Sequence, residues 1–202
     1  MTGVESTGPS AASTQGPSRV PPIDDWHRLL DGRVAVVTGG GTGIGGAISR
    51  LFGAHGALVE VVESDPDRAT LVVEDVEAAG GVARAHVADV RSDAEVEDLR
   101  SEVLGEHGRI NVLVNNVGDH RPLVRFHESN PESWSAMYAV NLEHLFRVTR
   151  AFLQPMIDSG GGSIVNVHSV EGMRGFPGEP VYAAMKAGAA HFTTSLLSLI
   201  HI

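Results

Sequence analysis

Short apolar segments rich in β-branched residues alternate with longer amphipathic segments through most of this chain. A short apolar run of this kind is typical of a strand that is buried on both faces of a sheet. Strands are predicted over residues 33–38, 57–62, 82–87, 112–114 and 163–167. Because a helical segment follows each strand, the pattern predicts right-handed βαβ units on one parallel sheet. The predicted fold class is α/β, with a Rossmann-type doubly wound parallel sheet.

The segments between the strands carry residues that favour helix starts and ends. Pro66 suits a first helical turn, and Gly80 with Gly81 suits the end of that helix. Ser92 is a typical N-cap, and Pro155 predicts a kink or an end in a long helical region. Helices are therefore predicted from the glycine-rich loop to about residue 53, and over residues 66–79, 93–107, 131–157 and 181–199.

The first part of the chain has a different composition. Residues 1 to about 24 are rich in Ser, Thr, Gly and Pro, and they offer little apolar area to offset the entropy lost on ordering. We therefore predict a disordered N-terminal leader over residues 1–28 and one folded domain over residues 29–202.

Charge and composition exclude several classes of function. The formal net charge is −10 and Lys and Arg are not clustered, which argues against binding to nucleic acid or to an anionic membrane surface. The chain has no cysteine, so disulfides and thiolate chemistry are excluded, and its 10 histidines lack metal-site spacing. It has no apolar run long enough for a membrane helix and no recognisable secretory signal. A cytoplasmic protein without a metal site is expected.

A glycine-rich loop, TGGGTGIG at residues 38–45, lies between the first predicted strand and the first predicted helix. Glycines allow a tight turn there and let backbone amides approach a pyrophosphate. The helix N-terminus adds unpaired N–H groups and the positive end of a dipole. The loop therefore predicts dinucleotide binding, with a purely structural turn as the alternative. The predicted contacts are Gly39, Thr42, Gly43, Ile44 and Gly45.

Glu63 stands at the end of the second predicted strand. A carboxylate at this place accepts hydrogen bonds from both ribose hydroxyls and repels a 2′-phosphate. No arginine directly follows the glycine loop. NAD is therefore predicted over NADP, and a solvated carboxylate at a strand end is the alternative.

Tyr182 and Lys186 are spaced by four residues in a predicted helix, so their side chains share one face. A nearby ammonium group favours the phenolate form of a tyrosine and allows it to exchange protons near neutral pH. Ser169 ends the fifth predicted strand, at the edge where a doubly wound sheet binds ligands. The three residues predict acid–base chemistry on an alcohol or carbonyl oxygen.

Together these motifs resemble the short-chain dehydrogenase/reductase family over about residues 30–199. The loop resembles the family pattern TGxxxGxG, and the family's NNAG has its counterpart at residues 115–118, with valine for alanine. Ser169 precedes Tyr182 at the family spacing, and Asn141 falls on the family's catalytic asparagine. The resemblance adds expected cofactor contacts at Asp89, Val90, Asn116, Val117 and Gly118.

The resemblance implies an NAD(H)-dependent oxidoreductase that interconverts a secondary alcohol and a ketone by hydride transfer. Tyr182 is the implied acid/base, and Lys186 is implied to lower its pKa and to bind the nicotinamide ribose. Ser169 is implied to orient the substrate oxygen, and Asn141 to support a proton-relay water. A homodimer or homotetramer is also implied, with an interface on the last two long helices. Core packing alone is the alternative explanation for the apolar stripe of the last helix.

Family members usually continue beyond the length of this chain, with a sixth strand, a segment over the substrate and a seventh strand. The resemblance therefore implies a chain truncated at its C-terminus, in which the fifth strand has an unpaired outer edge. This leaves open a second function, a non-catalytic remnant that binds dinucleotide or dimerises. His168 stands where the family often has serine. It is predicted to be a buried, hydrogen-bonded neighbour of Ser169, and a side chain that faces the crevice is the alternative.

Overall fold

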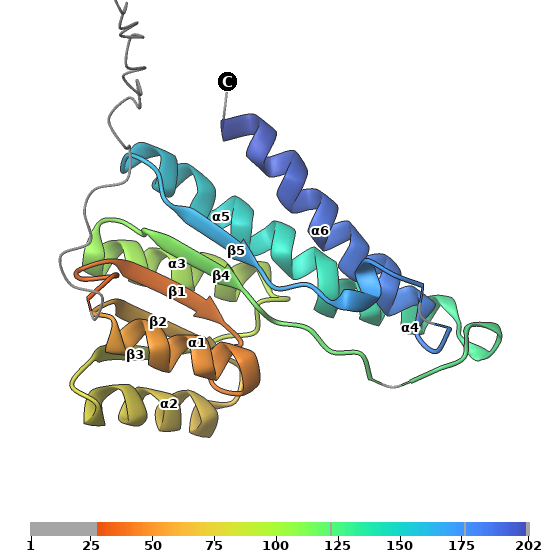
Figure 1. Cartoon of the computed structure of the whole chain (residues 1–202), viewed down its shortest axis with the longest axis horizontal. Coiled ribbons are helices and arrows are strands. Elements are labelled where there is room, and N and C mark those ends of the chain that lie inside the picture. Colours follow the sequence, from red (N-terminus) through yellow and green to blue (C-terminus); the bar gives the residue numbers. More distant parts are fainter. Residues whose placement is uncertain (1–27, 122, 176, 201–202) are drawn as a thin grey trace, which may run out of the picture.

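The computed structural model describes residues 28–121, 123–175 and 177–200 of the chain. The predicted leader lies outside the described residues, except for Arg28. The described residues form a parallel sheet with helices packed against it (Figure 1).

Five parallel strands form the sheet, in the spatial order β3-β2-β1-β4-β5. They are β1 (Val34–Thr38), β2 (Leu58–Glu63), β3 (Val82–Val87), β4 (Val112–Asn115) and β5 (Ser163–Asn166). All five predicted strands are thereby confirmed, as is the doubly wound fold. The order reverses between β1 and β4, and in such sheets ligands bind in the crevice at the carboxyl ends of the strands.

Alternate residues of β1 explain the layers of the fold. Val34 and Val36 pack with α3 (Asp93–His107) and α5 (His144–Asp158). Ala35 and Val37 pack on the other face with α1 (Gly43–Ala54) and α2 (Pro66–Ala78). None of these four residues is more than 2% exposed, as expected for a strand covered on both faces. The last helix, α6 (Pro180–Ile200), lies beside α5 (Figure 1).

Helix ends follow the predicted capping chemistry. At the start of α3 the Oγ of Ser92 accepts a hydrogen bond from Glu95 N at 3.3 Å. α2 begins at Pro66, as predicted, and the Asp65 side chain accepts hydrogen bonds from two amides of its first turn. Gly108 ends α3 with a φ of 66°, in the left-handed region that favours glycine.

The helical region predicted over residues 131–157 is divided in the structure. α4 (Pro131–Tyr138) leads into a π-helical turn over Ala139–Glu143, and α5 follows directly. No glycine or proline marks this turn, so periodicity alone does not reveal it. Pro155 lies inside α5, which continues to Asp158, so the alternative that this proline ends the helix is wrong.

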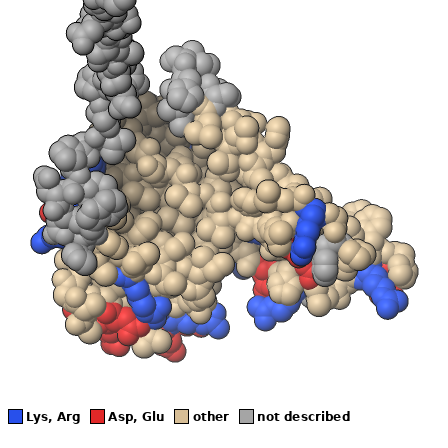
Figure 2. Space-filling view, viewed as in Figure 1, with Lys and Arg blue, Asp and Glu red and all other residues tan. Residues whose placement is uncertain are grey.

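The surface around β5 and α6 has little charge. Among the described residues β5 pairs with β4 alone, in agreement with the predicted unpaired outer edge. Lys186 is the only charged residue of α6, and it is buried. In the view of Figure 2 charged side chains gather at the lower margin and toward the right end, whereas the surface near β5 carries none. No helix within the described ranges is both long and apolar enough to cross a membrane.

Candidate active site

A cavity of about 640 Å³ opens at the carboxyl ends of the strands. The segments that follow all five strands line it, together with residues of α6. All but one of the predicted cofactor contacts lie on its wall: Gly39, Thr42, Gly43, Ile44, Glu63, Asp89, Val90, Asn116, Val117, Gly118, Tyr182 and Lys186. The exception is Gly45, which is buried behind the loop.

Gly45 supports the glycine loop from inside. A Cβ on this residue would lie 2.0 Å from the carbonyl oxygen of Gly39 and 2.5 Å from Asn116 Nδ2. That amide donates to the carbonyl oxygens of Thr38 and Gly39, at 3.1 and 3.2 Å. Gly43 is different, because its φ is 54° and no other segment of the described chain comes within 4 Å of its Cβ position. This open space at the N-terminus of α1 fits an anionic phosphate.

Glu63 lines the cavity at the end of β2, where charges of both signs meet. Its Oε1 accepts hydrogen bonds from Ser64 N at 2.9 Å and Ser64 Oγ at 3.2 Å, which leaves Oε2 for a ligand. Arg68 of α2 also lines the cavity. It lies well beyond the glycine loop in sequence, so the loop motif does not indicate it. Arg68 Nε lies 3.2 Å from Asp65 Oδ2, so an acidic neighbour offsets part of its charge.

Asp89 is held by Arg91, a partner that the motif does not include. The Arg91 Nε and Nη2 donate to the two carboxylate oxygens of Asp89, at 2.9 and 2.7 Å. This fork holds the pKa of Asp89 below its usual range. An ionised, fixed acceptor therefore lies on the cavity wall beyond β3.

Tyr182 and Lys186 face the cavity from one side of α6, as the spacing predicts. Lys186 Nζ lies 5.8 Å from the centroid of the Tyr182 ring and 3.5 Å from the carbonyl oxygen of Val167. Burial lowers the pKa of Lys186, because the ammonium form loses solvation.

Asn141 and Lys186 meet behind the wall that Gly118 forms. Asn141 is fully buried in the π-helical turn and does not line the cavity itself. A Cβ on Gly118 would lie 2.6 Å from Lys186 Nζ and 3.0 Å from Asn141 Oδ1. The structure therefore brings both predicted residues to one place and leaves room there only for glycine.

Ser169 lines the cavity, but Glu171 engages its hydroxyl. Ser169 Oγ donates to Glu171 Oε2 at 2.8 Å and accepts from Glu171 N at 3.3 Å, at the start of a 3₁₀ turn over Val170–Gly172. A serine whose hydroxyl bonds to the backbone two residues later is a local motif, and residues 169–171 contain it. His168 is exposed and lines the cavity, so its prediction as a buried residue is wrong and the alternative, a side chain that faces the crevice, agrees with the structure. The chain has left the sheet at this point, and the ring turns outward.

His144 is a buried polar residue near the site that no motif indicated. It is the first residue of α5, it is 1% exposed, and neither ring nitrogen has a hydrogen-bond partner among the described residues. Burial lowers the pKa of His144 to about 4, and the charge of Lys186 adds to this effect. The backbone of Val117 acts in the opposite direction and raises the pKa. The ring is therefore neutral at physiological pH.

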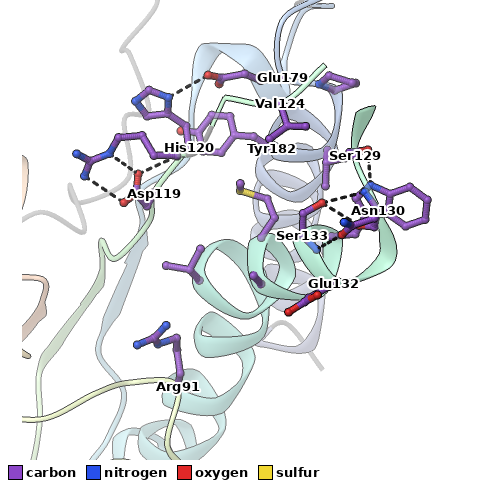
Figure 3. A pocket seen from close by; sticks show the side chains of 17 residues that line it. Arg91, Asp119, His120, Val124, Ser129, Asn130, Glu132, Ser133, Glu179 and Tyr182 are labelled. Carbon is purple, nitrogen blue, oxygen red and sulfur yellow. Dashed lines mark hydrogen bonds and ion pairs between the residues drawn. The ribbon is translucent and has the colours of Figure 1, made fainter. Parts of the chain in front are cut away.

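A second cavity, of about 490 Å³, lies on the other side of Tyr182 (Figure 3). It is enclosed by the chain after β4, by α4 and by the start of α6. His120 and Glu179 face each other at its upper end in this view, and Asn130, the N-cap of α4, lies with Ser133 of α4 on the other side of the cavity. Tyr182 lines both cavities. A small molecule bound here would therefore adjoin the same tyrosine as a ligand of the first cavity.

Residues 33–200 match a family model described as short chain dehydrogenase. The chain belongs to the short-chain dehydrogenase/reductase family. It is accordingly an oxidoreductase of a family that binds nicotinamide dinucleotides and acts on small-molecule substrates. No group of three or more potential metal ligands occurs in the described part of the chain.

Relatives and solved structures agree with this family. The chain is 36% identical over 171 residues to a 3-oxoacyl-acyl-carrier-protein reductase of Chlamydia muridarum, covering 84% of this chain and 68% of the relative. It is 39% identical over 166 residues to the reductase of that name from Thermotoga maritima, covering 81% and 66%. The chain thus spans about two thirds of the length of these relatives.

Two solved structures illustrate the range of cofactors among similar folds. A metagenomic short-chain oxidoreductase in complex with NADP has a TM-score of 0.81 and 36% identity, covering 85% of this chain and 78% of that one. A 7α-hydroxysteroid dehydrogenase complexed with NADH and 7-oxo glycochenodeoxycholic acid has a TM-score of 0.78 and 30% identity, covering 82% and 64%.

Proposed function

We propose that this chain interconverts a secondary alcohol and a ketone with NAD(H), and that Tyr182 is the acid/base. The observation that carries the proposal is the place of Tyr182, which lines the cavity of the expected nucleotide contacts and also the cavity beside it. Lys186 stands one helical turn away on the same side of α6. A nucleotide in one cavity and a substrate in the other would meet at this tyrosine.

The residues present fit a nicotinamide dinucleotide. The open space at Gly43 and the N-terminus of α1 suit the pyrophosphate, Asp89 and Val90 suit the adenine, and Asn116 to Gly118 suit the nicotinamide end. When bound, the nicotinamide ring would supply or accept the hydride.

The remaining steps belong to side chains of this chain. Tyr182 donates its phenolic proton to the substrate oxygen during reduction and takes it back during oxidation. The ammonium of Lys186 stabilises the phenolate that forms, and Asn141 holds the backbone beside that ammonium. Ser169 is proposed to hold the substrate oxygen once its hydroxyl is released from Glu171.

We propose NAD rather than NADP as the cofactor, on the evidence of Glu63. This carboxylate is 8% exposed and lines the cavity, so a 2′-phosphate beside it would be repelled with little screening by solvent. Arg68 is the counter-argument, but it is exposed and already contacts Asp65. Titration with NADH and NADPH tests the proposal, and tighter binding of NADPH by the unchanged chain would refute it.

A matched pair of variants sharpens the cofactor test. Glu63→Gln removes the negative charge at the same size, and the ratio of NADH to NADPH affinity is expected to fall about tenfold. Glu74→Gln removes an exposed charge of α2 outside the cavity, and the ratio should stay unchanged.

The catalytic assignment is tested by hydride transfer to a panel of secondary alcohols and ketones, followed at the absorbance of NADH. Tyr182→Phe is expected to lower kcat by at least about 10²-fold, because the acid/base is removed. Tyr138→Phe is the matched control, since this second tyrosine lines neither cavity. Equal activity in the Tyr182→Phe variant would eliminate Tyr182 as the acid/base.

A second candidate function is dinucleotide binding without turnover. It is supported by the hydrogen bond from Ser169 to Glu171, which diverts the hydroxyl from a substrate oxygen. NADH binding without hydride transfer to any alcohol or ketone of the panel would favour this candidate.

A homodimer or homotetramer is proposed on the surface of α4, α5 and α6. Trp134, Phe146 and Leu197 are large apolar residues exposed there. Because charge is scarce on α6, association would bury few ionised groups. Light scattering on the purified chain tests this proposal, and a monomer at micromolar concentration would contradict it.

A further inference from the structure

His120 and Glu179 form a polar pair between two segments that are far apart in sequence. His120 Nδ1 lies 2.9 Å from Glu179 Oε1 (Figure 3). His120 belongs to the chain that follows β4, and Glu179 immediately precedes α6. The Glu179 side chain is only 11% exposed, so this carboxylate is a fixed partner for the ring.

The pair adjoins the proposed acid/base. The centroids of the His120 and Tyr182 rings are 6.0 Å apart, and the ring planes meet at 62°. Both residues line the second cavity, as does Glu179. A group bound to the Tyr182 hydroxyl through one oxygen is therefore within reach of the imidazole through a neighbouring atom.

The hydrogen bond to Glu179 determines which nitrogen of the His120 imidazole can bind a ligand. An ionised carboxylate only accepts, so the contact with Glu179 places a proton on Nδ1. Nε2 is then the nitrogen that remains for a ligand. In the neutral ring Nε2 accepts from a hydroxyl, and in the protonated ring it donates to a hydroxyl or a carbonyl oxygen. In both protonation states, the group that suits Nε2 is an oxygen of the ligand.

The rest of the cavity argues against an anionic substrate. Asp119, Glu132 and Glu179 place three carboxylates on its wall. Of the two arginines there, Arg121 is bound to Asp119 by hydrogen bonds of 3.0 and 3.1 Å, and Arg91 is bound to Asp89. A carboxylate or phosphate on the substrate would meet repulsion that no unpaired cation on this wall offsets.

The cavity wall also carries apolar side chains, among them Val124, Ala136, Met137 and Val140. A substrate suited to this cavity therefore combines oxygen functions, which can reach His120, with a hydrocarbon part.

We infer that His120 is a specificity-determining residue that binds a second oxygen on the carbon next to the reacting carbon. The substrate class is then neutral vicinal diols and α-hydroxy ketones with an apolar remainder. Glu179 is a positioning residue that orients the ring. This inference rests on the proposed function, because it takes Tyr182 as the group that binds the reacting oxygen.

The test compares two alcohols that differ by one hydroxyl. trans-1,2-Cyclohexanediol and cyclohexanol are titrated into the complex of the full chain with NAD⁺, and kcat/KM is measured for both. The diol is expected to bind about tenfold more tightly and to show the higher kcat/KM. A larger ratio is not expected, because the His120 side chain is 51% exposed and water satisfies its nitrogen when the second hydroxyl is absent.

Variants separate recognition from folding. In His120→Ala the ratio of the two affinities should fall to about one, and in His120→Gln, which retains a terminal amide, it should recover in part. Glu179→Gln should give an intermediate ratio with a raised KM for the diol, because the ring is less well oriented. His127→Ala removes an exposed histidine outside both cavities and should leave the ratio unchanged.

The outcomes distinguish this inference from the proposed function. Equal affinity for the two alcohols, binding of neither, or a ratio that persists in His120→Ala would overturn the role of His120. The proposed function fails on different evidence, namely loss of NADH binding or unaltered turnover in Tyr182→Phe.

Discussion

The side chain of Asn141 and the backbone of Asp119 hydrogen-bond to each other in both directions. Asn141 Oδ1 accepts from Asp119 N at 3.2 Å, and Asn141 Nδ2 donates to Asp119 O at 2.7 Å. The amide also donates to the carbonyl oxygen of Met137, at 3.1 Å. Asn141 thus ties the π-helical turn to the chain after β4, which carries residues of both cavities.

Asn141→Ala is expected to destabilise the fold as well as the site. The substitution leaves partly buried backbone groups of Asp119 without partners, which costs about 1–3 kcal/mol. Chemical denaturation measures the change in the free energy of unfolding. Gln154→Ala removes an exposed side-chain hydrogen bond and should change that free energy by less than about 0.5 kcal/mol. A similarly small change in Asn141→Ala would argue against this role.

Gly118→Ala is expected to impair activity more than stability. The new Cβ would lie 2.6 Å from Lys186 Nζ, and the flexible lysine side chain can move away. A misplaced ammonium is expected to lower kcat by about 10²-fold and to weaken NADH binding. Turnover and NADH titration measure the two effects.

Gly105→Ala is the control for this substitution. Gly105 lies inside α3 with no atom within 4 Å of its Cβ position, so alanine should stabilise the helix by about 0.5–1 kcal/mol without changing kcat. Normal turnover in Gly118→Ala would show that the place of Lys186 next to Gly118 is not needed.

Glu171→Ala is expected to raise the rate of ketone reduction. The carboxylate accepts the Ser169 hydroxyl at 2.8 Å, and without it that hydroxyl is free to donate to the substrate oxygen. In other enzymes, removing one hydrogen-bond donor to the reacting oxygen lowers kcat by about 10²–10³-fold. The Ser169 hydroxyl is already partly available in the parent chain, so freeing it fully is expected to raise kcat/KM by only about tenfold. Glu128→Ala, an exposed acid outside both cavities, serves as the control. A lower kcat/KM in Glu171→Ala would mean that Glu171 assists Ser169.

His144 is expected to make the fold less stable in acid. Its pKa is lowered from 6.5 to about 4, so below pH 6.5 the unfolded chain binds a proton that the folded chain does not. Its contribution is lost as the pH falls from 6.5 toward 4, and at pH 5 the loss is about 2 kcal/mol.

His144→Leu should remove this contribution, because leucine fills the buried site without an ionisable group. The difference in unfolding free energy between variant and parent is the quantity to measure at pH 7.5 and pH 5. It is expected to shift in favour of the variant by about 2 kcal/mol on acidification. A difference independent of pH would rule out a neutral buried imidazole at this place.

Local sequence patterns were sufficient to predict the fold and many of the residues that line the first cavity. The β-branched run of β1 has all of its residues buried, and burial on both faces is what such a composition favours. The glycine loop between a strand and a helix places Gly39 and Gly43 at positive φ, a conformation that other residues rarely adopt. Tyr182 and Lys186 share a helix face because of their spacing alone. Each of these predictions depends on residues close together in the chain.

Contacts between distant segments decided the rest. The π-helical turn places Asn141 against Asp119, His120 meets Glu179, and Arg68 lies with Glu63 on one cavity wall. His144 has a lowered pKa chiefly because the packed sheet and helices exclude water around it, and the charge of Lys186 adds to the shift. Backbone periodicity and short motifs describe one segment at a time, so the sequence by itself determined the order of elements, the nucleotide loop and the tyrosine–lysine pair. The packing of the helices on the sheet decided which side chains from separate segments share a cavity. It also decided how far each of these side chains is exposed to water and to neighbouring charges.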